Sequence, residues 1–258
     1  MRNEFGKLDA ALRDRGRLVT AVIVRTAGST PRKAGTRMAV FDDGSSLGTI
    51  GGGSFEDTVT RDAQALFASK GCALRHYAFH PDEAGKGSAI CGGEADVFYE
   101  YHESAPRLLV FGAGHCGKAL LRAAALAGYR LRVTDDRAEL LDEVRAWNEP
   151  AVEECLPLDP SLETLPDFDP GSAVVIMTRN HEFDEEILKK VIRKPCAYLG
   201  MIASKSKAGT IRGRLLAEGF TPGELERVHM PIGIPIHSET PEEIAVSILG
   251  ELISVRNA

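Results

Sequence analysis

One cysteine of the chain lies in a setting that favours thiol chemistry. Cys91 follows Ser88-Ala-Ile and precedes Gly92 and Gly93. Glycine neighbours favour exposure of the thiol, and a nearby cation would lower the thiol pKa and favour the thiolate. A thiolate is a soft ligand that suits molybdenum, and it can also carry sulfur. Cys91 is therefore the candidate catalytic residue, with a loop cysteine that has no role as the alternative.

A basic loop rich in turn formers precedes it in the chain. Residues 28–38 combine glycine, serine and proline with three cations, and Arg32 and Arg37 are two of them. Backbone N–H groups and guanidinium groups in such a loop can bind a phosphate or an oxo-anion. A solvated surface loop is the alternative.

Three successive glycines form a second candidate ligand site. Gly51, Gly52 and Gly53 come just before a predicted helix that carries Glu56. Such a run is costly in backbone entropy, which indicates that something approaches this backbone closely. We expect ligand contact here.

A third glycine cluster has the spacing of a dinucleotide-binding turn. An apolar run is followed by Gly112-Ala-Gly114-His115-Cys-Gly117, and then by an Ala/Leu-rich helix. In this pattern the glycines permit a tight turn, close approach of a pyrophosphate and helix–strand packing. Asp135 follows 18 residues after Gly117, where an acid can bind a ribose diol and favours NAD over NADP. The alternative is a turn that only shapes the fold.

Polar residues also follow a later apolar run, in Thr178-Arg-Asn-His181. Open α/β sheets bind ligands at the carboxyl ends of their strands, so His181 is a candidate proton carrier or phosphate partner. A helix-capping or surface role is the alternative.

The composition narrows the class of protein. The 258 residues are 43% apolar and 26% charged, with a formal net charge of −6, which is typical of a soluble globular protein without a nucleic-acid or membrane-surface footprint. No run approaches the roughly 20 apolar residues that span a bilayer, and no signal-peptide core is visible, so we expect a cytoplasmic location. Five widely spaced cysteines without a CxxC pair argue against disulfides and against a thiolate zinc site.

The elements that must position these residues form two halves. Residues 105–258 alternate continuously apolar runs with helical segments, which predicts an α/β Rossmann-type parallel sheet domain. Residues 1–104 predict a smaller α+β domain: a helix near 4–14, a strand at 18–25, a hairpin at 43–44, a helix from 54 and an alternating strand at 94–101. Ser104-Ala-Pro106 is the predicted linker.

Taken together, these stretches resemble the XdhC/CoxI family of xanthine dehydrogenase accessory factors. The resemblance is carried, in order, by GSTPRKAGTRM at 28–38, GTIGGGSFE at 48–56, ICGG at 90–93, VFGAGHCGKAL at 110–120, VTDDR at 133–137, MTRNH at 177–181, YLGMIASKSK at 198–207 and PIGIPIHSETPEEIAVSILGELI at 231–253.

The resemblance implies a maturation factor that binds the molybdenum cofactor (molybdopterin) while a cysteine desulfurase supplies sulfide. The cofactor then passes to a xanthine dehydrogenase-like apoenzyme. Carried over to this chain, it places Cys91, the Gly51–Gly53 turn and Arg32 or Arg37 at the cofactor. Many relatives have a cysteine where this chain has Ser54, which weakens the case for ligation by two thiols. We expect a homodimer.

Two rival functions belong to other classes. An NAD-dependent oxidoreductase would use the Rossmann turn, with His181 as its acid/base, but would leave the N-terminal glycine and cysteine loops without a purpose. A docking scaffold would keep the turn only as a structural element and would bind only protein clients.

Overall fold

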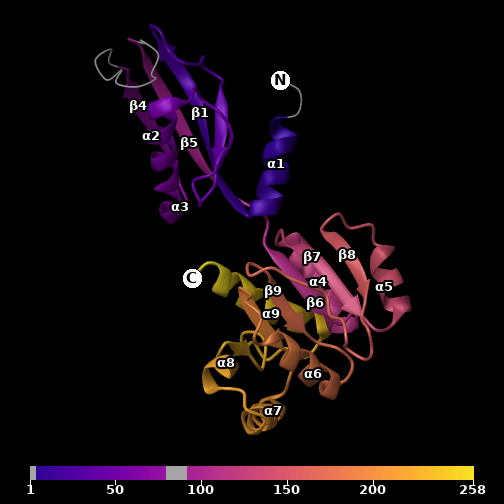
Figure 1. Cartoon of the computed structure of the whole chain (residues 1–258). Helices are drawn as coiled ribbons and strands as arrows, with labels where there is room; N and C mark the ends of the chain where they lie inside the picture. The colour runs from indigo at the N-terminus through magenta and orange to yellow at the C-terminus, as the bar shows by residue number, and fades with distance from the viewer. Residues whose placement is uncertain (1–3, 80–91) are drawn as a thin grey trace. The chain divides into compact units, whose positions relative to one another are not determined.

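A computed structural model describes residues 4–79 and 92–258 of the chain. Contacts divide the chain into two compact units, Met1–Ser104 and Ala105–Ala258. Each unit has its own hydrophobic core. Figure 1 shows the helices and strands of both units.

The described part of the first unit is an antiparallel sheet with helices on both faces. Its strands are β1 (Arg17–Ala27), β2 (Arg37–Val40), β3 (Ser46–Gly48), β4 (Cys72–Ala78) and β5 (Glu94–Glu103), in the order β3-β2-β1-β5-β4. Its helices are α1 (Glu4–Arg15), α2 (Gly53–Gln64) and α3 (Leu66–Ser69). Alternation along β1 sends Val19 and Ala21 toward Phe55 and Val59 of α2, while Leu18 packs with Leu8 of α1.

The second unit is a parallel sheet of Rossmann order. Its strands are β6 (Arg107–Phe111), β7 (Arg130–Asp135), β8 (Val152–Pro157), β9 (Ala173–Ile176), β10 (Tyr198–Met201) and β11 (Val228–His229), in the order β11-β10-β9-β6-β7-β8. Its helices are α4 (His115–Leu126), α5 (Ala138–Arg145), α6 (His181–Val191), α7 (Lys205–Ala217), α8 (Pro222–Glu226) and α9 (Pro241–Arg256).

Helices cover both faces of this sheet. Leu108 and Val110 of β6 face the cluster that includes residues of α4, α5 and α9, whereas Leu109 and Phe111 face α6, α7 and α8 (Figure 1). Burial on both faces explains why these strands are continuously apolar. The predicted fold class, a Rossmann-type parallel sheet preceded by a smaller α+β part, is confirmed.

The strand order places a switch point beside β6. The chain leaves β6 toward β7 on one side, and β9 lies on the other. Open α/β sheets bind ligands in the crevice at the carboxyl ends of the strands at such a point. This edge carries the glycine turn after β6 and the polar loop after β9.

Candidate functional site: two glycine turns and a switch-point crevice

In the first unit, the triple glycine forms a turn closed by Glu56. Gly51, Gly52 and Gly53 have φ values of 139°, 76° and 64°, a region that favours glycine. Glu56 Oε2 accepts hydrogen bonds from Thr49 Oγ1 at 2.5 Å, Ile50 N–H at 3.1 Å and Gly52 N–H at 3.0 Å. Burial opposes ionisation of Glu56, but these hydrogen bonds outweigh it and lower its pKa. Glu56 therefore organises the turn.

The basic loop packs directly on this turn. A Cβ on Gly51 would stand 2.6 Å from Pro31 Cβ and 3.7 Å from Arg32 Cγ. Arg32 therefore lies beside the triple glycine, where the family resemblance implied Arg32 or Arg37. Arg37 does not share this place, because its guanidinium carbon lies 4.7 Å from the centre of the Phe5 ring of α1.

The glycines after Cys91 pack on the other part of the same loop. A Cβ on Gly93 would stand 2.6 Å from the Ala27 carbonyl oxygen and 2.4 Å from that of Ser29. Two motifs, the triple glycine and Gly92-Gly93, are thus held on one loop by contacts that only glycine permits. Cys91 itself lies outside the described residues.

In the second unit, the turn after β6 has the close contacts that its glycines predict. Gly112 has φ 115°, donates its N–H to the Thr134 carbonyl oxygen at 2.7 Å, and would place a Cβ 2.3 Å from the Met177 oxygen. A Cβ on Gly117 would stand 2.0 Å from the Gly112 oxygen. Gly114 is the N-cap of α4 without a side-chain cap, and His115 is exposed as its first residue. The helix thus presents its amino end to the crevice.

Asp135 is tied to this turn and to Arg137. Its Oδ2 accepts the Ala113 N–H at 2.7 Å and Arg137 Nη2 at 2.9 Å, while Oδ1 accepts the Arg137 N–H at 3.0 Å and Nε at 2.8 Å. Burial disfavours the charged carboxylate, yet these bonds lower the pKa of Asp135. Sequence spacing placed Asp135 at the crevice, but did not indicate these partners.

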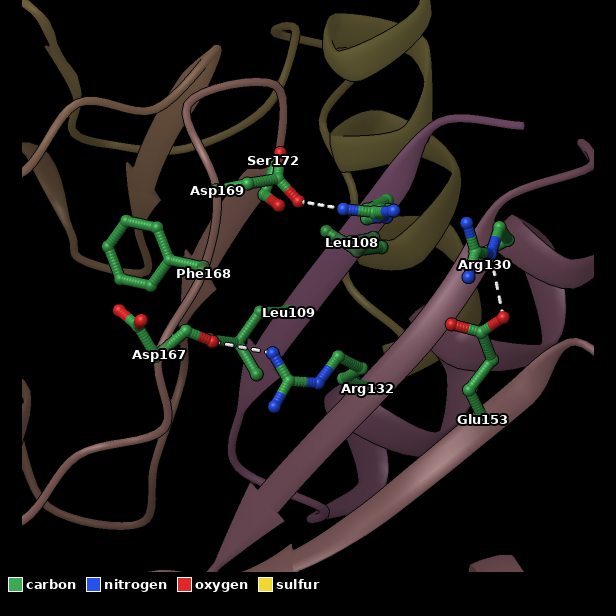
Figure 2. A pocket seen from close by; sticks show the side chains of 10 residues that line it. Leu108, Leu109, Arg130, Arg132, Glu153, Asp167, Phe168, Asp169 and Ser172 are labelled. Atoms are coloured by element: carbon green, nitrogen blue, oxygen red, sulfur yellow. Dashed lines mark hydrogen bonds and ion pairs between the residues drawn. The ribbon is translucent and has the colours of Figure 1, made fainter. Parts of the chain in front are cut away.

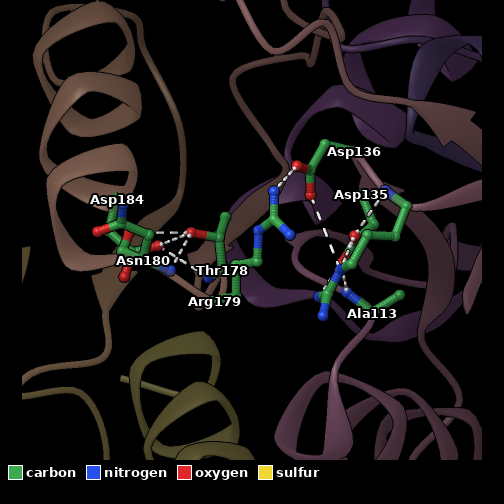
Figure 3. A network of polar contacts seen from close by, with 8 residues as sticks. Ala113, Asp135, Asp136, Thr178, Arg179, Asn180 and Asp184 are labelled. Atoms are coloured by element: carbon green, nitrogen blue, oxygen red, sulfur yellow. Dashed lines mark hydrogen bonds and ion pairs between the residues drawn. The ribbon is translucent and has the colours of Figure 1, made fainter.

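A second ion pair joins the loop after β9 to the end of β7. Arg179 Nη2 donates to Asp136 Oδ2 at 2.6 Å, and Figure 3 shows Arg179 pointing from its own loop toward Asp136. On the other side of this loop, buried Asp184 Oδ1 accepts the N–H and hydroxyl of Thr178 at 2.8 and 2.7 Å. Sequence reasoning missed Asp136 and Arg179, although both stand in the quoted motifs.

His181 is the first residue of α6. Asn180 is the N-cap, and its side chain accepts the Glu182 N–H at 3.0 Å. The capping role that was the alternative for His181 therefore belongs to its neighbour. The orientation of the His181 side chain lies outside what the structure describes.

A pocket of about 380 Å³ lies at the opposite, amino edge of the sheet. Arg107 and Arg130, which begin β6 and β7, line it together with Phe168 (Figure 2). Arg107 pairs with Asp169, and Arg130 Nε donates to Glu153 at 2.6 Å. Paired charges of both signs give this pocket no net preference for an anion. The sequence offered no signal for it beyond arginines at two strand starts.

Neither a metal cluster nor a membrane span is found in residues 4–79 and 92–258. No three or more His, Cys, Asp or Glu side chains there are arranged to hold a metal ion. None of the helices in these ranges is both long and apolar enough to cross a bilayer.

The parallel sheet with its strand order and the glycine turn after β6 define a Rossmann-type domain. The chain matches the description "XdhC Rossmann domain" over residues 108–252 and "XdhC and CoxI family" over residues 11–78. The chain therefore belongs to the XdhC family, as its motifs predicted.

Individual relatives agree with this membership. The uncharacterized protein YqeB of Escherichia coli is 35% identical over 92% of this chain, which spans 43% of the length of YqeB. A probable xanthine dehydrogenase subunit from Bacillus subtilis is 24% identical, with 99% of this chain and 98% of that protein covered. A crystal structure described as a xanthine dehydrogenase from Bacillus halodurans shares the fold, with a TM-score of 0.51, 22% identity, and coverage of 98% of this chain and 95% of that one.

Proposed function

We propose that this protein is an accessory factor for a xanthine dehydrogenase-like enzyme, and that it holds the molybdenum cofactor and delivers it to the apoenzyme. Membership of the XdhC family and the Bacillus subtilis relative, whose name refers to xanthine dehydrogenase, support the accessory role. The observation that carries the cofactor proposal is the packing of the first unit, where one loop carries Arg32 beside the triple glycine and seats Gly92-Gly93.

The donors present suit the anionic end of molybdopterin. Around the triple glycine, Arg32 supplies a cation and the uncapped α2 amino end supplies N–H groups. In the crevice, the α4 amino end and Arg137 offer the same chemistry to a phosphate. Glu56 supports the first site by fixing the turn, and not by contact with the cargo.

Cys91 is the residue that we assign to sulfur or molybdenum chemistry. It is covalently joined to Gly92, whose neighbour Gly93 packs on the basic loop. A thiolate there would ligate molybdenum, or it would attack the outer sulfur of a persulfide on a cysteine desulfurase and take that sulfur, while the desulfurase cysteine leaves as a thiolate. We also propose that the protein acts in the cytoplasm and forms a homodimer.

Co-elution of molybdopterin with the purified protein tests the cofactor function. We expect retention by the wild type, and a loss of at least tenfold in retention or transfer for Cys91→Ser. Cys72→Ser is the matched control, because Cys72 is an exposed cysteine on β4 of the same unit. No retention by the wild type would overturn the proposal, and equal effects of both substitutions would remove Cys91 from the site.

The rival function, an NAD-dependent oxidoreductase, is favoured by the switch-point crevice alone. The ultraviolet spectrum and mass of the small molecules released from the purified protein separate the two. A pterin supports the accessory function, and a nicotinamide supports the rival.

A further inference from the structure

The carboxylate that a dinucleotide would need is already saturated. A carboxylate has about four acceptor directions on its two oxygens. Asp135 uses four hydrogen bonds, one to Ala113 and three to Arg137, and the residue is only 2% exposed. In Rossmann domains that bind NAD, the acid at this place accepts the hydroxyls of the adenosine ribose. A ribose diol finds no open acceptor on Asp135.

We infer that Arg137 is a specificity-determining residue of the crevice: it closes the ribose position to a dinucleotide and leaves the glycine turn to a phosphate monoester without a ribose there. The inference rests on the proposed function only in taking the crevice as a ligand site. Arg137 holds both oxygens of Asp135 through Nε and Nη2, a two-point arrangement that a guanidinium forms and an ammonium cannot.

The same guanidinium stands over the turn. Arg137 Nη2 is 3.9 Å from the position of a Cβ on Gly114, the uncapped N-cap of α4. A phosphate at the amino end of α4 therefore meets the Arg137 cation while Asp135 stays covered. This places positive charge at the turn without freeing the ribose acceptor.

Arg179 pairs with Asp136, and it can exchange this carboxylate for the bound phosphate. Its side chain is 59% exposed, whereas that of Asp136 is 13% exposed. The exposed Arg179 side chain can turn toward solvent, and Asp136 then keeps a second cation, because Arg137 Nε lies 3.8 Å from its Oδ1. Figure 3 shows Arg179 reaching from the β9 loop toward Asp136 at the end of β7. A phosphate bound over the turn competes with the Asp136 carboxylate for this guanidinium.

Calorimetric titration of the full chain with two probes tests the inference. The probes are phenyl phosphate, a monoester on a ring without ribose, and NAD. We expect the wild type to bind phenyl phosphate at least tenfold more tightly than NAD. Arg137→Lys keeps the charge but uncovers part of Asp135, so we expect NAD to gain at least tenfold. Arg179→Ala should weaken phenyl phosphate binding about tenfold, and an unchanged affinity would overturn the role of Arg179.

Arg122→Ala is the control, because Arg122 lies on α4 but packs over Trp147, at 4.4 Å from its ring centre. A wild type that binds NAD as tightly as phenyl phosphate, or binds neither, overturns the inference, as does an unchanged ranking in a folded Arg137→Lys. If Arg137→Lys fails to fold, the inference is decided by two other measurements. These are the relative affinities of the wild type for phenyl phosphate and NAD, and the affinity of Arg179→Ala for phenyl phosphate. If the wild type binds phenyl phosphate more tightly than NAD but does not retain molybdopterin, only the proposed function is overturned.

Discussion

The Glu56 carboxylate accepts the N–H of Gly52 at 3.0 Å, so a side chain from the first turn of α2 holds the backbone that precedes it. The same oxygen also accepts the Thr49 hydroxyl and the Ile50 N–H. Glu56 thus fixes the triple glycine from within the chain before any ligand arrives, while the first-turn N–H groups of α2 have no side-chain cap.

Glu56→Gln should lower the free energy of unfolding by about 1 to 2 kcal/mol, because three charge-assisted hydrogen bonds become neutral or are lost. Urea unfolding measures it. Asp57→Asn is the matched control, an exposed neighbour on the same helix, and should stay within about 0.5 kcal/mol of the wild type. Equal stability of Glu56→Gln and the control would show that the turn stands without the carboxylate.

The same contact predicts a pH dependence. The pKa of Glu56 is lower in the folded chain than its ordinary value of 4.5. Such a group contributes stability that is fully present above pH 4.5 and is lost as the pH falls through the folded pKa. Urea midpoints measured from about pH 6 down to about pH 3 should therefore fall less steeply for Glu56→Gln than for the wild type. Parallel curves would contradict the assignment.

Gly51→Ala should destabilise the first unit by about 2 to 4 kcal/mol, through backbone strain and contact with Pro31. Gly53→Ala also has a positive φ but open space around its Cβ, so about 1 to 2 kcal/mol is expected. Chemical denaturation gives both values, and molybdopterin retention should fall more in Gly51→Ala. The reverse order would mean that the basic loop does not lie on the turn.

Gly117→Ala should cost about 1 to 3 kcal/mol or prevent folding of the second unit, because the new methyl group meets the Gly112 oxygen. Gly209→Ala is its counterpart in the exposed middle of α7, where nothing lies within 4 Å of a Cβ. That change should stabilise the chain by about 0.5 to 1 kcal/mol. Thermal and urea unfolding of the two variants should move in opposite directions, and a shared direction would contradict the turn geometry.

The sequence predicted the central parallel strands and both glycine turns, because double-sided burial leaves continuous apolar runs such as 107–111 and 173–177. Edge strands escaped prediction. β8 and β4 are mostly exposed or half-exposed and contain charged residues, so neither has an apolar signal. β11 has only two residues.

Some residues of the candidate site could be predicted from the sequence, but Arg137, Asp136, Arg179 and the ion pairs that they form could not. Glycine spacing located the crevice and Asp135, since backbone geometry demands those residue types. The partner of Asp135 depends on how Arg137 folds back at the end of β7, and the partner of Asp136 comes from the β9 loop. Such contacts depend on tertiary structure, and a local sequence pattern does not predict them.

Backbone pairing between β6 and β9 limits how this crevice can open. Met177 N–H donates to the Phe111 carbonyl oxygen at 2.8 Å, and Phe111 pairs with Ile176, so the ends of the two strands cannot separate without parting the sheet itself. Widening is confined to the segment beyond Met177, which carries Arg179. The size of ligand that can bind therefore depends on how far that short segment moves outward, because the paired ends of β6 and β9 beneath it stay in place.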